Sequence, residues 1–157
     1  MKNIEYEYRN LPIPGGGYVT GFLFDQDREK VLYIRTDIGG CYRFSYENRH
    51  WDSLSESVNM FDLSETYPIA IATDLQQDET LYVISGINKE GTEGTFSISH
   101  DGGKTYTREM IPCFVHGNLN GRGTGYRLVQ NPKDKTTLYF ASQKDGLLWT
   151  GDHGKTW

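Results

Sequence analysis

Two stretches of the chain share one pattern: SHDGGKTY at residues 99–106 and TGDHGKTW at residues 150–157. Both contain, in the same order, a hydroxyl residue, Asp, Gly, Thr and an aromatic. In such a turn the Asp side chain accepts backbone N–H groups, Gly supplies a positive φ, and the aromatic ring packs beside the strands. We therefore assign both copies to architecture, built by Ser99, Asp101, Gly103, Asp152, Gly154 and Trp157.

A Leu-Tyr pair repeats along the chain, within VLYIRTD (31–37), TLYVISG (80–86) and TLYFASQ (137–143). Its copies begin at Leu32, Leu81 and Leu138, so they are 49 (81 − 32) and 57 (138 − 81) residues apart. This spacing suits propeller blades with some loop insertion. Short apolar segments with turn residues between them, and no helical period, predict an all-β antiparallel fold. We expect β-propeller blades of four antiparallel strands, with the repeated turn joining the third and fourth strands.

The repeat divides the chain into a first blade at about 15–60, a second at about 67–112 and an incomplete third at about 121–157. Fewer than three full blades are present, whereas closed propellers have roughly four to eight. We therefore expect residues 1–157 to be a fragment of a larger propeller protein.

Composition excludes several function classes. A net charge of −5 with scattered basic residues argues against nucleic acid, and no apolar run is long enough for a transmembrane helix. The start, MKNIEY, has no apolar h-region, so we expect no signal peptide in these residues, and the compartment stays open. Cys41 and Cys113 allow one disulfide at most, and the four His residues lack zinc-site spacing. We expect no metal and no cofactor.

The loops between strands sort onto two faces. The face opposite the repeated turns collects the glycine-rich segments 15–17, 37–40, 86–94, 116–125 and 144–146. Asp37 ends an apolar strand on this face, which suits acid–base chemistry, although capping of its own turn is the alternative. Asp145 is a rival carboxylate, but an Asp-Gly pair there favours a turn. Trp51, Trp149 and Trp157 are expected in the core.

The repeated turn resembles the Asp-box, or BNR repeat, of sialidases and related propellers. The segments PGGGYVTG (14–21), RTDIGGCYR (35–43) and GRGTGYRL (121–128) resemble the N-terminal end of glycoside hydrolase family 74, the xyloglucanases. Two departures are Tyr126, where the family usually has Glu, and Cys41, where Ala is common.

The resemblance implies two seven-bladed propellers, often secreted, with the substrate in the cleft between them. It also implies inverting hydrolysis of the β-1,4-glucan backbone of xyloglucan, a polysaccharide degradation reaction. Asp37 would be the general base, and the general acid, from the second propeller, has no counterpart in this chain. Whether the glucan is cleaved internally or from one of its ends, and which branching pattern is preferred, stay open.

Candidate substrate contacts follow from the same resemblance. Gly39 and Gly40 would bring the backbone close to the sugar, and Tyr18, Tyr42 and Arg122 would contact it, with packing within a blade as an equal alternative. Two other functions remain open. A sialidase-like hydrolase is one, although RNLP at residues 9–12 matches its early motif poorly. A non-catalytic Asp-box propeller that binds a glycan or a protein is the other.

Overall fold

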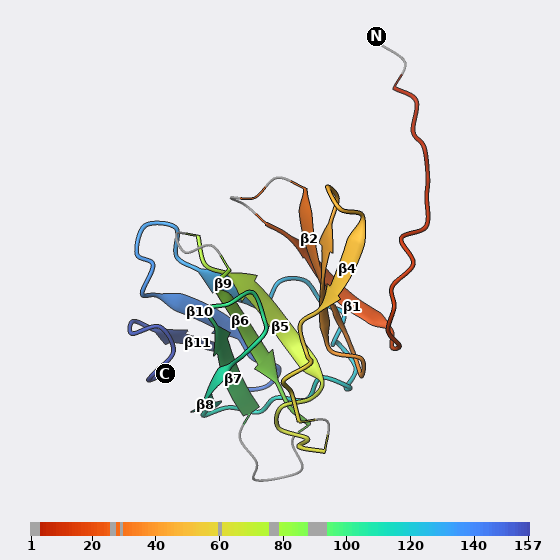
Figure 1. The fold of residues 1–157 in the computed structure, drawn as a ribbon. Coiled ribbons are helices and arrows are strands. Elements are labelled where there is room, and N and C mark those ends of the chain that lie inside the picture. Colours follow the sequence, from red (N-terminus) through yellow and green to blue (C-terminus); the bar gives the residue numbers. More distant parts are fainter. Residues whose placement is uncertain (1–3, 26–27, 29, 60, 76–78, 88–93) are drawn as a thin grey trace.

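The computed structural model describes residues 4–25, 28, 30–59, 61–75, 79–87 and 94–157. These residues form three antiparallel sheets that lie side by side, with no helix among them (Figure 1). The sheet orders are β1-β2-β3-β4, β5-β6-β7-β8 and β9-β10-β11, so each strand pairs with its neighbours in sequence. The predicted all-β fold with four-stranded antiparallel sheets is confirmed. In the part of the chain described, no helix could span a membrane.

The strands are short, as the turn-rich sequence predicts. They are β1 (Val19–Phe24), β2 (Val31–Thr36), β3 (Cys41–Ser45), β4 (His50–Ser53), β5 (Pro68–Thr73), β6 (Leu81–Ser85), β7 (Gly94–Ser99), β8 (Thr107–Ile111), β9 (Leu128–Gln130), β10 (Leu138–Ala141) and β11 (Leu147–Thr150).

The middle sheet is covered on both faces. Its strands β5 and β6 are buried along their whole length, and β5 contacts β1, β2 and β9. One face meets the first sheet in a core of Tyr33, Cys41, Leu54, Ile71, Leu81 and Val83. The other face meets the third sheet in a core that includes Tyr82, Phe96, Cys113, Leu128 and Phe140. Burial on both faces explains why these strands read as continuous apolar runs.

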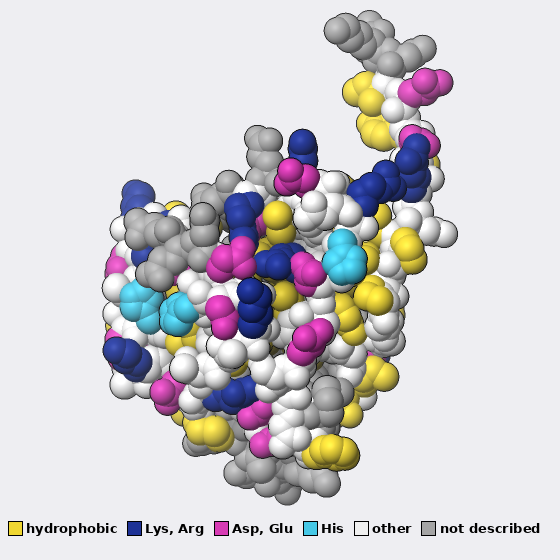
Figure 2. Space-filling model, viewed as in Figure 1, with side chains coloured by type: hydrophobic (Ala, Val, Ile, Leu, Met, Phe, Trp, Pro, Cys, Tyr) yellow, Lys and Arg dark blue, Asp and Glu magenta, His cyan; other side chains and the backbone are white. Residues whose placement is uncertain are grey.

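The two outer sheets leave apolar faces uncovered. On the first sheet Phe22 and Phe24 are exposed, and apolar side chains gather on the same side of the molecule, beneath the N-terminal segment (Figure 2). On the third sheet Trp149 is 61% exposed, which corrects the expectation that it lies in the core. Trp51 is buried, and Trp157 packs edge-on against Phe96.

In each repeated turn, side-chain oxygens accept the backbone N–H groups. Ser99 Oγ accepts the N–H of Gly103 at 2.8 Å, and Asp101 Oδ1 accepts the N–H of Thr105 at 2.9 Å. The second copy repeats both contacts at 2.9 Å, with Thr150 and Asp152 as acceptors. Hydroxyl and backbone hydrogen bonds stabilise the charged carboxylates, so the pKa values of Asp101 and Asp152 lie below the ordinary value.

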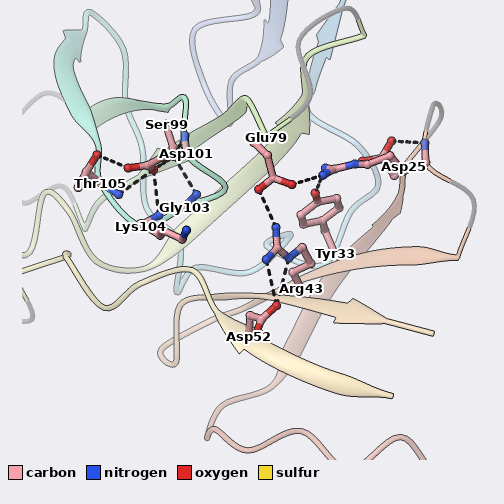
Figure 3. Close-up of polar contacts among 11 residues, drawn as sticks. Asp25, Tyr33, Arg43, Asp52, Glu79, Ser99, Asp101, Gly103, Lys104 and Thr105 are labelled. Atoms are coloured by element: carbon pink, nitrogen blue, oxygen red, sulfur yellow. Dashed lines mark hydrogen bonds and ion pairs between the residues drawn. The ribbon is translucent and has the colours of Figure 1, made fainter. Parts of the chain in front are cut away.

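An ion-pair network joins the first two sheets on the face of the repeated turns. Glu79, from the β5–β6 connection, accepts from Arg28 at 2.6 Å and from Arg43 at 3.0 Å (Figure 3). Arg43 also pairs with Asp52 at 3.0 Å. The Glu79 side chain is 45% exposed, so we expect each pair to contribute no more than about 1 kcal/mol.

Replacing Gly154 by Ala should destabilise the protein strongly. A Cβ on Gly154 would lie 2.0 Å from Phe96 Cε1, and the residue has φ +87°. Gly146 is the matched control, because it has φ +79° and open space around it. Gly146→Ala should cost the backbone penalty alone, roughly 1–2 kcal/mol. Gly154→Ala should cost about 1–3 kcal/mol more, since a buried ring must move. Equilibrium urea unfolding measures both losses, and equal losses would contradict the close packing of Gly154 against Phe96.

Candidate functional site

Asp37 follows directly on β2 and is 8% exposed. Its Oδ1 accepts the N–H of Tyr18 at 2.8 Å, and its own N–H donates to the Tyr18 carbonyl at 3.0 Å. Both contacts tie Asp37 to the segment that leads into β1. The carboxylate therefore has a fixed orientation, with one oxygen committed to the backbone and Oδ2 free of that bond.

The turn after Asp37 is stabilised by its neighbours. Thr36 Oγ1 accepts the N–H of Gly39 at 2.8 Å and donates to the Gly40 carbonyl at 3.1 Å. The Tyr42 hydroxyl donates to the Gly39 carbonyl at 2.7 Å. Thr36 thus takes the capping role that sequence alone also allowed for Asp37. Tyr42 is 7% exposed, so its hydroxyl stabilises the turn while its side chain offers little surface to a ligand.

Glycines allow the two loops of the site to approach each other closely. A Cβ on Gly39 would lie 1.9 Å from the Gly16 carbonyl oxygen. Gly17 has φ +103°, and a Cβ there would meet Asp37 Oδ1 at 3.1 Å. Gly40 has φ +88° and packs against Ser55. A side chain at Gly39 or Gly17 would push the 15–17 loop away from the carboxylate, whereas one at Gly40 would displace Ser55.

Arg122 comes to the same site from the 116–125 segment. Its Nε lies 3.3 Å from Asp37 Oδ2, and its guanidinium carbon lies 5.7 Å from the centre of the Tyr18 ring. Arg122 Nε makes no aligned hydrogen bond to any described residue. Tyr18 is 64% exposed. The structure thus brings three predicted site residues together: a carboxylate, a guanidinium and an open aromatic ring.

Arg35 was missed by the sequence reasoning. It is 3% exposed, and its guanidinium donates to Thr20 Oγ1 at 2.7 Å, to the Arg122 carbonyl at 2.9 Å and to the Gly125 carbonyl at 3.3 Å. Burial lowers the pKa of Arg35 to about 10, so the side chain stays charged at neutral pH. A charged residue within the apolar run VLYIRT was the signal that could have identified it.

Asp145, the other carboxylate considered on this face, makes a different contact. Asp145 Oδ2 accepts the N–H of Phe114 at 2.7 Å, which ties the 142–146 turn to the end of the second sheet. The remaining predicted segment of this face, 86–94, lies outside the described residues at 88–93. No cluster of three or more metal-binding side chains occurs where the structure is described.

Comparison with known proteins finds relatives of the chain. No family model matches the chain. A xyloglucanase from a Paenibacillus species is 34% identical over 97% of the chain. The crystal structure of a family 74 xyloglucanase from Xanthomonas campestris superposes with a TM-score of 0.81 at 31% identity over 96% of the chain. Over nearly its whole length, the chain is similar to part of a family 74 glycoside hydrolase.

Another family 74 structure, from Niastella koreensis, matches with a TM-score of 0.78 at 30% identity over 94% of the chain. A probable oligoxyloglucan-reducing end-specific xyloglucanase from Neosartorya fischeri is 33% identical over 97% of it. The chain spans 15% of the Paenibacillus protein, 19% of the Neosartorya protein and 22% of each family 74 structure. The three sheets therefore correspond to a part of the family 74 propellers.

Replacing Gly39 by Ala should disrupt this site, whereas the same change at Gly16 should not. The new methyl group at Gly39 would overlap the Gly16 carbonyl, while a Cβ on Gly16 has no atom within 4 Å. We expect Gly39→Ala to lower the free energy of unfolding by roughly 1–3 kcal/mol. Gly16→Ala should stay within about 0.5 kcal/mol of the original protein. Urea unfolding of both variants, with tyrosine fluorescence as the probe, tests this difference. A neutral Gly39→Ala would rule out the close approach.

Proposed function

We propose that the protein carrying this chain is a glycoside hydrolase that cleaves the β-1,4-glucan backbone of xyloglucan with inversion. In this proposal Asp37 is the general base. The observation that carries the proposal is the carboxylate of Asp37, which is fixed through Tyr18 and faces Arg122 with its second oxygen. Two relatives whose names state a xyloglucanase activity support the substrate class.

The chemistry needs two carboxyl groups, and this chain supplies one. Ionised Asp37 would take a proton from a water molecule as the water oxygen attacks the anomeric carbon. The bond from that carbon to the glycosidic oxygen breaks, and a carboxylic acid outside this chain protonates the leaving oxygen. An inverting pair stands about 6.5–9.5 Å apart, which leaves room for the water. A second propeller of the protein would provide the acid.

The open side of the site suits a sugar ring. Tyr18 exposes its ring, and aromatic faces pack against the C–H face of a sugar. The Arg122 guanidinium lies beside this ring and pairs with Asp37 through Nε, so it lines the same side of the site. Gly39 and Gly40 add no side chains of their own to the turn beside Asp37. Tyr42 would act through the turn that it supports, since its hydroxyl is bonded to Gly39.

Asp37→Asn in the whole protein should abolish the hydrolysis of xyloglucan. The amide keeps the size of the side chain but cannot take the proton, and losing a general base costs roughly 10²–10⁴-fold in rate. Asp145→Asn is the matched control, an isosteric change to another carboxylate on the same face, and should retain activity. Release of reducing ends from xyloglucan measures both. Activity surviving in Asp37→Asn would refute the assignment.

The stereochemistry of the first product tests the mechanism separately. Direct attack by water on a β-glucoside inverts the anomeric carbon, so the new reducing end should appear first as the α-anomer. Proton NMR of the anomeric region during the first minutes of reaction distinguishes the two anomers before they equilibrate. A β-anomer as first product would mean retention, and Asp37 would then need a different role.

A further inference from the structure

Arg35 is a buried cation with an unusual set of partners. Its guanidinium is bonded to one hydroxyl and two backbone carbonyls, and no carboxylate of a described residue pairs with it. Removing a charge from water is costly unless its hydrogen bonds are satisfied, so these three acceptors are what hold the side chain in place. Two of them, the carbonyls of Arg122 and Gly125, lie 87 and 90 residues away in sequence.

The neighbouring strand is shaped around this guanidinium. Gly21 of β1 stands opposite Arg35 of β2 in the sheet, beside a register irregularity between Val19 and Gly21. A Cβ on Gly21 would lie 2.9 Å from an Arg35 nitrogen. The space that a side chain would fill on β1 is therefore occupied by the guanidinium, which fixes the direction in which Arg35 reaches.

The 116–125 segment, which Arg35 holds, contains Arg122, a residue of the candidate site. Arg127, which follows the segment, donates to the Gly121 carbonyl at 3.1 Å and to Thr124 Oγ1 at 2.7 Å within it, and also to the Ala141 carbonyl at 3.0 Å. Arg127 thus fastens the segment to the third sheet. Arg35 fastens it to the first sheet, through the backbone of the residue whose side chain faces Asp37.

We propose that Arg35 is a positioning residue, which sets the place of Arg122 beside Asp37 by holding the carbonyls of Arg122 and Gly125. This inference rests on the proposed function, because the site that it positions is the one assigned to hydrolysis. Arg35 itself does not touch substrate. Arg35 lies on β2, and Asp37 directly follows that strand. One rigid element therefore orients both the carboxylate and the segment that carries Arg122.

The test is a double-mutant cycle in the whole protein, with xyloglucan as substrate. Arg35→Met removes the three hydrogen bonds and keeps an unbranched side chain. Misplacing Arg122 should lower kcat/KM by up to about 100-fold. The loss should be divided between a lower kcat and a higher KM in the same proportion as in Arg122→Ala. If Arg35 acts through Arg122, the double variant should be no worse than Arg122→Ala alone. Additive losses, or wild-type activity in Arg35→Met, would overturn the proposal.

Two further variants keep the test decisive if Arg35→Met does not fold. Gly21→Ala leaves Arg35 in the chain but displaces its guanidinium, and should reproduce the same split between kcat and KM. Arg35→Lys keeps the charge but cannot reach all three acceptors, and should be intermediate. Full activity in either variant counts against the proposal.

Arg43→Met is the matched control for a general loss of stability. Arg43 also joins the first sheet to another, but on the opposite face, through Glu79 and Asp52. Arg43→Met should lower the melting temperature only modestly, since partly exposed ion pairs contribute at most about 1 kcal/mol each. It should leave kcat/KM within about twofold, because Arg43 lies on the face opposite Asp37. An equal loss of activity in Arg43→Met would mean that stability alone explains Arg35. Failure of the proposed function is seen separately, as a wild-type protein that does not cleave xyloglucan.

Discussion

The middle sheet has two apolar faces, and both must be covered. Because β5 and β6 are buried throughout, the sheets on either side are held at a distance set by the side chains between them. The candidate site depends on that distance. Asp37 belongs to the first sheet, while Arg122 lies on the connection that leads to the third. A site assembled from both needs the core between them to be rigid.

Packing alone brings the first sheet and the connection to the third sheet near each other. Polar contacts then fix how the two are placed relative to one another. On one face of the molecule Glu79 links the first two sheets through partly exposed ion pairs. On the other face Arg35 links the first sheet to the 116–125 segment from a buried position. Exposed pairs tolerate rearrangement, whereas a buried guanidinium with fixed acceptors does not. The more demanding contact lies on the face that carries Asp37.

The sequence predicted the fold class because the repeat is local. The Leu-Tyr segments and the turns after them are each specified by residues close together, so their periodicity could be read directly. Contacts of the site are not local. Arg35 reaches carbonyls far away in sequence, and no spacing rule connects them. The exposure of Trp149 was also missed, because its strand pattern is the same whether or not another sheet covers it. The blade boundaries and the roles of the site residues stay predictions.

The two cysteines lie in different places with respect to the middle sheet. Cys41 is in the core shared with the first sheet, and Cys113 is in the core shared with the third. Burial raises the pKa of each thiol to about 12, so neither is a reactive thiolate at neutral pH while the sheets are packed. Alkylation of Cys41 would therefore report the opening of one interface, and alkylation of Cys113 the opening of the other. The chain carries its own pair of chemical probes for the order in which its sheets separate.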